Sequence, residues 1–96
     1  MKLSQLLENI EGVYQRAGDA EITGICHDSR SVRPGDLFVC IKGALFDPHE
    51  HVDDIVRKGA AAIVAEREID GPAGIPVFIA AHGRDASAHI AAAWYG

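Results

Sequence analysis

Three adjacent polar residues, Asp28, Ser29 and Arg30, are the part of this sequence best suited to chemistry. They supply a carboxylate acceptor, a hydroxyl and a permanent cation at consecutive positions. They follow an apolar run at residues 22–26, and a second apolar run comes at residues 37–41. Each run has the length of a strand and is bounded by turn residues. A polar segment held between two strands in this way can bind a small polar ligand.

Pro34 and Gly35 predict a tight turn within the same polar segment. Proline fixes φ and glycine accepts a positive φ, which together favour a compact reversal of the chain. The turn should hold the end of the first strand beside the start of the second. We therefore expect the loop around Ser29 to be rigid.

The charge distribution favours a small anionic ligand over a polymer. The net charge of −5 argues against a nucleic-acid partner, which usually requires a basic patch. Basic residues nevertheless gather locally at Arg30, Arg33 and Lys42. Arg33 is interpreted as a solvated surface charge, and the others suit a small anion.

The histidines do not predict a metal site, and no cofactor is expected in this chain. His49 and His51 are two residues apart in a predicted helix, so their side chains point in different directions. His82 and His89 have no ligand partner at a recognisable spacing. The sequence also shows no nucleophile beside a general base.

The cysteines and the N-terminal residues indicate a cytoplasmic protein. Cys26 and Cys40 fall inside predicted strands, where free buried thiols are typical of a reducing compartment, although a disulfide between adjacent strands is the alternative. Met1 and Lys2 precede a mixed helix rather than the apolar core of a signal peptide. No apolar run approaches the ~20 residues of a membrane span, so no membrane partner is expected.

Two of the expected helices lie near the ends of the chain. Leucines and an isoleucine at helical spacing predict a short amphipathic helix over residues 3–10, which Gly12 should end. Gly83 should open the final helix. Its core-facing residues are expected to be Ala86, Ile90, Ala93 and Trp94.

A βαβ unit is expected in the middle of the chain. Asp47 is a predicted N-cap, with Pro48 and Glu50 in the first turn, and Gly59 should end this helix. Apolar runs predict strands over residues 22–27, 36–42, 61–65 and 75–80. A strand, a helix and a strand in succession imply parallel pairing. The direction of the last strand is left open by its short connection. The predicted class is α/β, with a small, mostly parallel or mixed sheet flanked by helices.

The sequence resembles the Mur ligase family over essentially its whole length. The resemblance rests on Asp-Ser-Arg at 28–30, Pro-Gly-Asp-Leu-Phe-Val at 34–39, Lys-Gly at 42–43 and Asp-x-His at 47–49. It is similar to the N-terminal domain of these enzymes. The pattern most resembles the ligase that adds the third residue to UDP-N-acetylmuramoyl-L-alanyl-D-glutamate. The ligase that adds D-alanyl-D-alanine has a related domain.

The resemblance implies a set of residues that bind the UDP-sugar. Ser29 would contact the uridine, and His27 would lie near the uracil; a turn serine and a strand-end histidine are the alternatives. The loop Ala44, Leu45 and Phe46 would touch the nucleotide. Phe46 would stack on uracil, or pack as a hydrophobic staple on the next helix.

One position departs from the family pattern. This chain has Pro48 where the family usually has glycine between the aspartate and the histidine. Proline has no backbone N–H, so a phosphate contact from that amide is not available here.

The resemblance also implies a division of labour in a larger enzyme. A Mur ligase activates a carboxylate with ATP and captures the acyl phosphate with an amine, which requires a Gly-x-x-Gly-Lys-Thr loop and Mg²⁺. No such loop occurs in these 96 residues. Residues 1–96 are therefore expected to be one non-catalytic domain, with ATP and Mg²⁺ bound elsewhere in a parent ligase. Its central and C-terminal domains would be this domain's partners.

The implied role is to hold the UDP-N-acetylmuramoyl end of a dipeptide substrate during peptidoglycan precursor synthesis, a process that supports cell shape and division. The third residue would be meso-diaminopimelate or L-lysine. A stand-alone nucleotide-sugar-binding module is one alternative. A phosphotransfer-type enzyme is another, and the absence of a phosphate loop counts against it.

Overall fold

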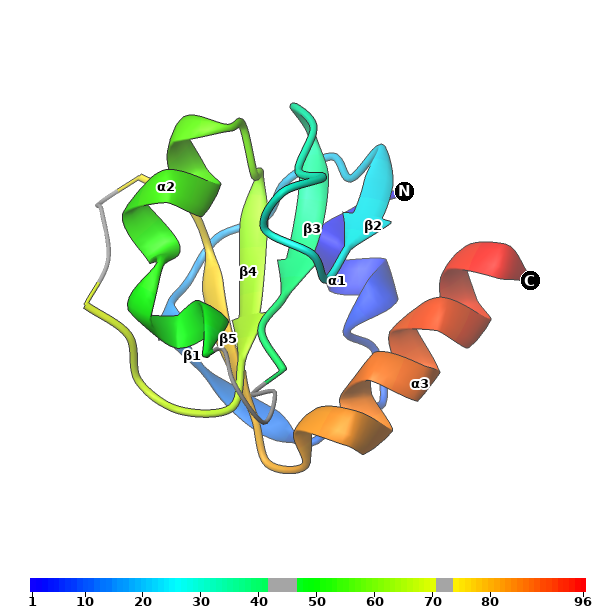
Figure 1. Ribbon diagram of the computed structural model, residues 1–96. Helices are drawn as coiled ribbons and strands as arrows, with labels where there is room; N and C mark the ends of the chain where they lie inside the picture. The colour runs from blue at the N-terminus through cyan, green and yellow to red at the C-terminus, as the bar shows by residue number, and fades with distance from the viewer. Residues whose placement is uncertain (42–46, 71–73) are drawn as a thin grey trace.

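A computed structural model describes residues 1–41, 47–70 and 74–96 of the chain. Its centre is a five-stranded sheet in the order β1-β5-β4-β3-β2 (Figure 1). The strands are β1 Gly12–Arg16, β2 Gly24–Cys26, β3 Asp36–Val39, β4 Ala62–Ala65 and β5 Val77–Ala80. Strands β2 to β5 are parallel, and β1 is antiparallel to β5. The mixed sheet confirms the predicted α/β class.

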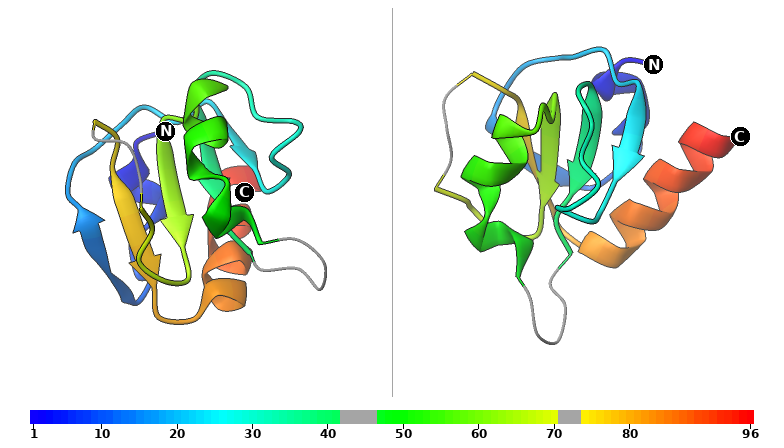
Figure 2. Two further views of the ribbon diagram at one scale, coloured as in Figure 1. Left: turned by 60° about the vertical axis from the view of Figure 1, so that its left-hand side comes forward. Right: turned by 45° about the horizontal axis from the view of Figure 1, so that its top comes forward.

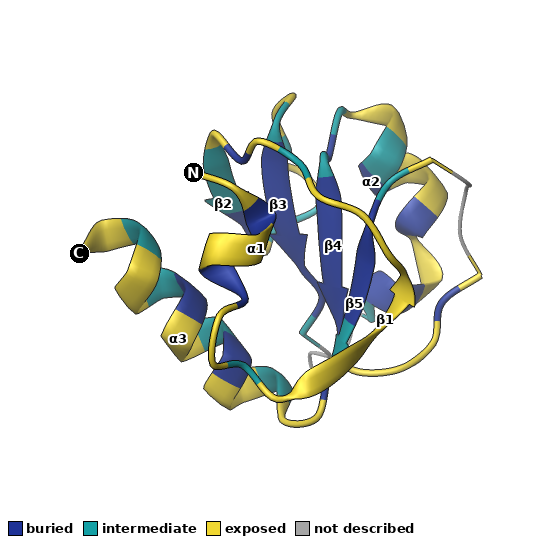
Figure 3. Cartoon of the chain, turned by 180° about the vertical axis from the view of Figure 1, so that it is seen from behind, coloured by how far each residue is buried: buried dark blue, intermediate teal, exposed yellow. Residues whose placement is uncertain are grey.

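Helices cover both faces of the sheet. They are α1 Leu3–Leu6, the 3₁₀ helix η1 Pro48–Glu50, α2 Val52–Arg57 and α3 Gly83–Tyr95. Helices α1 and α3 lie on one face and α2 on the other (Figures 1 and 3). None of these helices, within the described ranges, has the length and apolar character needed to cross a membrane.

Side-chain alternation along β3 builds both halves of the core. Leu37 and Val39 pack in the cluster that includes α1 and α3. Phe38 and Cys40 point the other way, into the cluster that includes Ile55 of α2. This two-residue period is the geometry of a strand buried on both faces.

The predicted βαβ unit is confirmed by β3, α2 and β4. Leu37 pairs with Ala62, and Val39 pairs with Val64, in parallel register. The predicted strands were a few residues too long at their ends, while the parallel pairing predicted for β3 and β4 was right. The last strand, left open above, pairs in parallel with β4. Figure 2 shows these parallel strands with α2 packed across one face.

The helix predicted to begin at Asp47 is interrupted. The Asp47 side chain does cap it, since it accepts a hydrogen bond from the His49 N–H at 3.1 Å. A 3₁₀ turn follows and ends at His51, where φ is −123°, before α2 begins. The expectation of one continuous helix is therefore wrong. Gly59, with φ +107°, ends α2 as predicted.

Two expectations near the chain ends are corrected. The first helix covers only Leu3–Leu6, and Gly12 opens strand β1 instead of ending a helix. In α3, Ala86 and Ile90 are buried as predicted, but Ala93 is exposed. Trp94 is partly buried against the core.

Candidate ligand-binding site

The carboxyl ends of β2, β3 and β4 meet at one edge of the sheet because these strands are parallel. Ligands of open α/β sheets commonly bind at this edge. Strand β2 ends at Cys26, directly before residues 27–30. Strand β4 ends at Ala65, and Glu66 beyond it contacts His49 from the segment that follows β3. The polar residues predicted from sequence thus lie at the expected edge.

The Asp28 carboxylate organises the loop after β2. It accepts hydrogen bonds from the Arg30 backbone N–H at 2.9 Å and from its guanidinium Nε and Nη2 at 3.1 and 3.0 Å. The Asp28 carbonyl accepts from the Ser31 N–H at 2.9 Å. The hydrogen bonds from Arg30 hold the pKa of Asp28 at about 2. Ser29 is therefore carried by a loop that is fixed on both sides.

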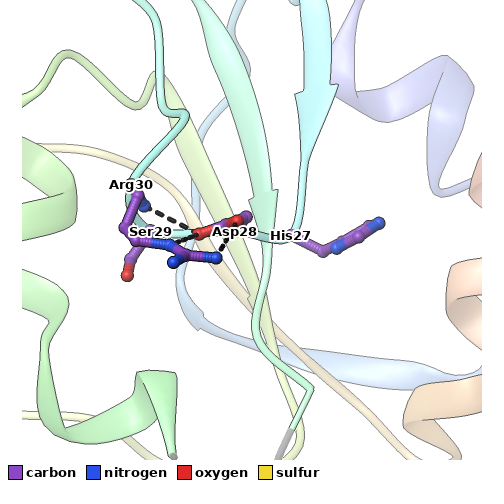
Figure 4. Close-up of a pocket in the computed structure, with 4 residues that line it drawn as sticks. All are labelled: His27, Asp28, Ser29 and Arg30. Carbon is purple, nitrogen blue, oxygen red and sulfur yellow. Dashed lines mark hydrogen bonds and ion pairs between the residues drawn. The ribbon is translucent and has the colours of Figure 1, made fainter.

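A hollow of about 510 Å³ lies over this loop, lined by His27, Asp28, Ser29 and Arg30. Figure 4 shows Asp28 and Arg30 facing each other, with His27 directed away from them. The Arg30 side chain is 87% exposed, so its guanidinium can still meet an anion. Ser29 is half-buried and His27 is exposed. The arrangement offers a hydroxyl, an imidazole and a cation to a small polar ligand.

The predicted tight turn completes the loop on its far side. The Asp36 N–H donates to the Arg33 carbonyl at 3.1 Å, and Gly35 has φ +89°. These are the features of a type II turn with proline and glycine at its centre. Arg33 is exposed, as predicted from the sequence.

A polar junction built on His49 lies at the same edge. The imidazole is buried, and its Nδ1 lies 2.6 Å from an Asp47 carboxylate oxygen. Its Nε2 accepts a hydrogen bond from the Glu66 N–H at 2.9 Å, and Arg67 bonds the other Asp47 oxygen at 3.0 Å. Since Nε2 accepts, the proton of the neutral ring sits on Nδ1. Partial burial raises the pKa of Asp47, but the hydrogen bonds from His49 and Arg67 outweigh it and lower the value to about 2.

The two cysteines are free and buried. The Cys26 thiol donates to the Asp28 carbonyl at 3.0 Å, which ties the loop to the end of β2. Burial raises the pKa of Cys40 to about 12. The raised pKa keeps the Cys40 thiol protonated and unreactive at neutral pH.

The structure brings together only part of the predicted site. Ser29 and His27 lie beside the same hollow. The predicted loop Ala44, Leu45 and Phe46 lies outside the described residues, as does Lys42. Within the described ranges, no group of three or more His, Cys, Asp and Glu side chains is arranged to hold a metal ion.

Sequence reasoning missed Lys58. Its ammonium donates to the Ser29 carbonyl at 2.8 Å, from a position 29 residues further along the chain. No local pattern connects the two. The Asp-x-His spacing of Asp47 and His49, by contrast, was visible in the sequence, but it was interpreted as a helix cap and a family motif and not as a side-chain contact.

Comparison with known proteins identifies the family and the fold. The family described as "Mur ligase family, catalytic domain" matches residues 21–95. The chain belongs to the Mur ligase family. Among Mur ligases, it is 49% identical to the UDP-N-acetylmuramoyl-L-alanyl-D-glutamate--2,6-diaminopimelate ligase of Bacillus licheniformis, covering 100% of this chain and 20% of that protein. It is 41% identical to the enzyme of the same name from Geobacillus thermodenitrificans, covering 100% of this chain and 19% of that one.

A solved Mur ligase shares the fold. MurF from Acinetobacter baumannii aligns with a TM-score of 0.75 and 31% identity, covering 94% of this chain and 20% of that chain. The chain therefore spans about a fifth of the length of the relatives it matches. Its identity to the two diaminopimelate ligases named above, 49 and 41%, is higher than its 31% identity to MurF of Acinetobacter baumannii.

Proposed function

We propose that this chain binds the UDP-N-acetylmuramoyl end of a peptidoglycan precursor. The observation that carries the proposal is the loop of Asp28, Ser29 and Arg30, fixed at the carboxyl edge of parallel strands beside a hollow of about 510 Å³. The hydroxyl of Ser29 forms a hydrogen bond with the uridine, and the exposed guanidinium of Arg30 pairs with the diphosphate. His27 lies beside the uracil, and residues 44–46 supply the remaining nucleotide contacts.

The activity belongs to a larger ligase of which residues 1–96 form one domain. That enzyme adds 2,6-diaminopimelate to UDP-N-acetylmuramoyl-L-alanyl-D-glutamate, as the names of relatives at 49 and 41% identity suggest. ATP and Mg²⁺ are held by a central domain, and this domain anchors the far end of the substrate. Binding energy from this remote part of the substrate positions the reacting carboxylate in the catalytic domain, although no reaction takes place at the UDP end.

The ligase that adds D-alanyl-D-alanine is the second candidate. The match to MurF of Acinetobacter baumannii, with a TM-score of 0.75, favours it. Both candidates use a UDP-N-acetylmuramoyl substrate, so the role proposed for Ser29 is common to them. The lower identity of 31% ranks this candidate second.

Substitution of Ser29 tests the proposal. Ser29→Ala removes one hydrogen-bonding group, and we expect UDP affinity to fall about threefold to tenfold, corresponding to about 0.5–1.5 kcal/mol. Calorimetry or NMR titration with UDP gives the dissociation constants. Ser31→Ala is the matched control, since Ser31 is exposed and contributes to the loop through its backbone N–H. Equal affinity of the Ser29→Ala variant and the unmodified chain would remove Ser29 from the site.

A further inference from the structure

The C-terminal end of α2 is fixed to the turn that closes the candidate loop. The Gly35 N–H donates to the Gly59 carbonyl at 3.0 Å. Gly59 has φ +107°, and a Cβ at this position would lie 2.7 Å from the Pro34 Cα. Only glycine allows this approach without displacement of the turn. The end of α2 and the loop after β2 therefore form one rigid contact.

Lys58 projects from this fixed helix end to the loop. Its backbone N–H bonds the Asp54 carbonyl as the C-cap of α2. Its ammonium donates to the Ser29 carbonyl at 2.8 Å and lies 3.2 Å from an Asp54 carboxylate oxygen. The lysine side chain is 38% exposed, so it is partly covered by these contacts.

The contact from Lys58 constrains Ser29, the residue proposed to bind the uridine. Asp28 fixes the loop from within, through Arg30. Lys58 fixes it from outside, at the peptide carbonyl of Ser29 itself. A carbonyl held in place limits rotation of the Ser29 peptide unit, and with it the direction of the Ser29 hydroxyl.

We propose that Lys58 is a positioning residue, which orients the Ser29 loop for ligand binding without touching the ligand. The inference rests on the proposed function, since it assumes that Ser29 contacts the uridine. Lysine has three N–H donors, and two of them are directed to Ser29 and Asp54. Its charge is paired with Asp54, so the effect of Lys58 on binding passes through the loop.

The test compares Lys58→Met with Arg57→Met in the 96-residue chain. Methionine keeps much of the apolar stem and removes the ammonium. Arg57 is the neighbouring exposed cation, and its side chain bonds the Asp53 carbonyl on its own helix. Arg57→Met therefore removes the same charge without altering the Ser29 loop. The probes are uridine, which lacks phosphate, and UDP.

We expect Lys58→Met to lower the affinities for uridine and for UDP by the same factor. That factor should be about threefold to tenfold, the range for one lost hydrogen bond. Arg57→Met should change uridine affinity less than twofold. Unchanged affinity in Lys58→Met would overturn the inference. A loss confined to UDP would also overturn it, because it would mean that Lys58 contacts phosphate directly.

A ligand-free measurement separates this inference from the proposed function. Amide hydrogen exchange at Arg30 and Ser31, which both donate to Asp28, should be faster in Lys58→Met than in the unmodified chain and in Arg57→Met. If the unmodified chain binds neither probe, the proposed function fails. In that case, faster exchange in Lys58→Met would still support a role of Lys58 in ordering the loop. Unchanged exchange in this variant would reject that role as well.

Discussion

At the residue scale, the buried imidazole of His49 joins segments that are distant in sequence. Its Nδ1 bonds Asp47, and its Nε2 accepts from the Glu66 N–H. It thereby ties the segment after β3 to the end of β4. A buried ring that both donates and accepts in this way specifies the geometry of the edge on which the candidate site lies.

Removal of this ring should lower stability. His49→Ala leaves the Glu66 N–H without its imidazole acceptor, removes one of the donors to Asp47, and leaves a cavity. We expect a loss of about 1–3 kcal/mol in the free energy of unfolding, measured by urea denaturation. His89→Ala is the control, because His89 is exposed on α3 and its loss should cost less than about 0.5 kcal/mol. Similar midpoints for both variants would show that the junction contributes little.

The residues of the loop were partly predictable. The turn at Pro34 and Gly35 was predicted correctly, because it depends on local chemistry. The contact from Lys58 was not predictable, since it depends on how α2 crosses the sheet. The role of His49 was missed for the same reason: its acceptor contact is with Glu66, on another strand end.

At the element scale, the main surprise is β1. Its residues are all exposed, so the sequence lacks the apolar alternation by which an edge strand is usually recognised. The strand forms through backbone pairing with β5 and through the edge-to-face contact of Tyr14 with Phe78, whose ring centroids are 5.1 Å apart. By contrast, β3, α2 and β4 carried strong apolar patterns and cap signals, and the sequence predicted their order and direction.

Gly12 offers a test of how β1 is held. A Cβ there would contact the Ile79 carbonyl oxygen and lie 2.7 Å from the Phe78 ring. Gly12→Ala should therefore force the two strands apart and cost about 1–3 kcal/mol, as overpacking usually does. Amide exchange along residues 13–16 should accelerate relative to β3. Val13→Thr, at a position 65% exposed, should leave exchange unchanged. If the β1 amides of Gly12→Ala are protected from exchange as well as those of the unmodified chain, β1 tolerates the added methyl group.

At the scale of the whole molecule, the proposed function places substrate binding in this chain and catalysis in other domains of a larger ligase. The chain spans about 20% of the length of its diaminopimelate ligase relatives. Its sequence contains no Gly-x-x-Gly-Lys-Thr loop for ATP. We therefore propose that the anchoring role and the chemistry reside in different domains of the ligase.

The separation predicts that the 96-residue chain does not turn over ATP. A phosphate-release assay with Mg²⁺-ATP should give the rate of a buffer blank, with or without added UDP-N-acetylmuramoyl-dipeptide. The physical reason is that phosphoryl transfer needs a phosphate cradle and metal ligands that the sequence does not supply. Phosphate release above the blank that persists through purification would contradict this assignment.

The most direct test of the central claim is an NMR titration of the chain with UDP-N-acetylmuramic acid, followed residue by residue. The account predicts saturable amide shifts at residues 27–30 and 44–46, with α3 Gly83–Tyr95 largely unaffected. The affinity should be modest, because the other domains of the ligase supply further contacts. Shifts confined to α3, with residues 27–30 and 44–46 silent at saturating ligand, would contradict the proposed site.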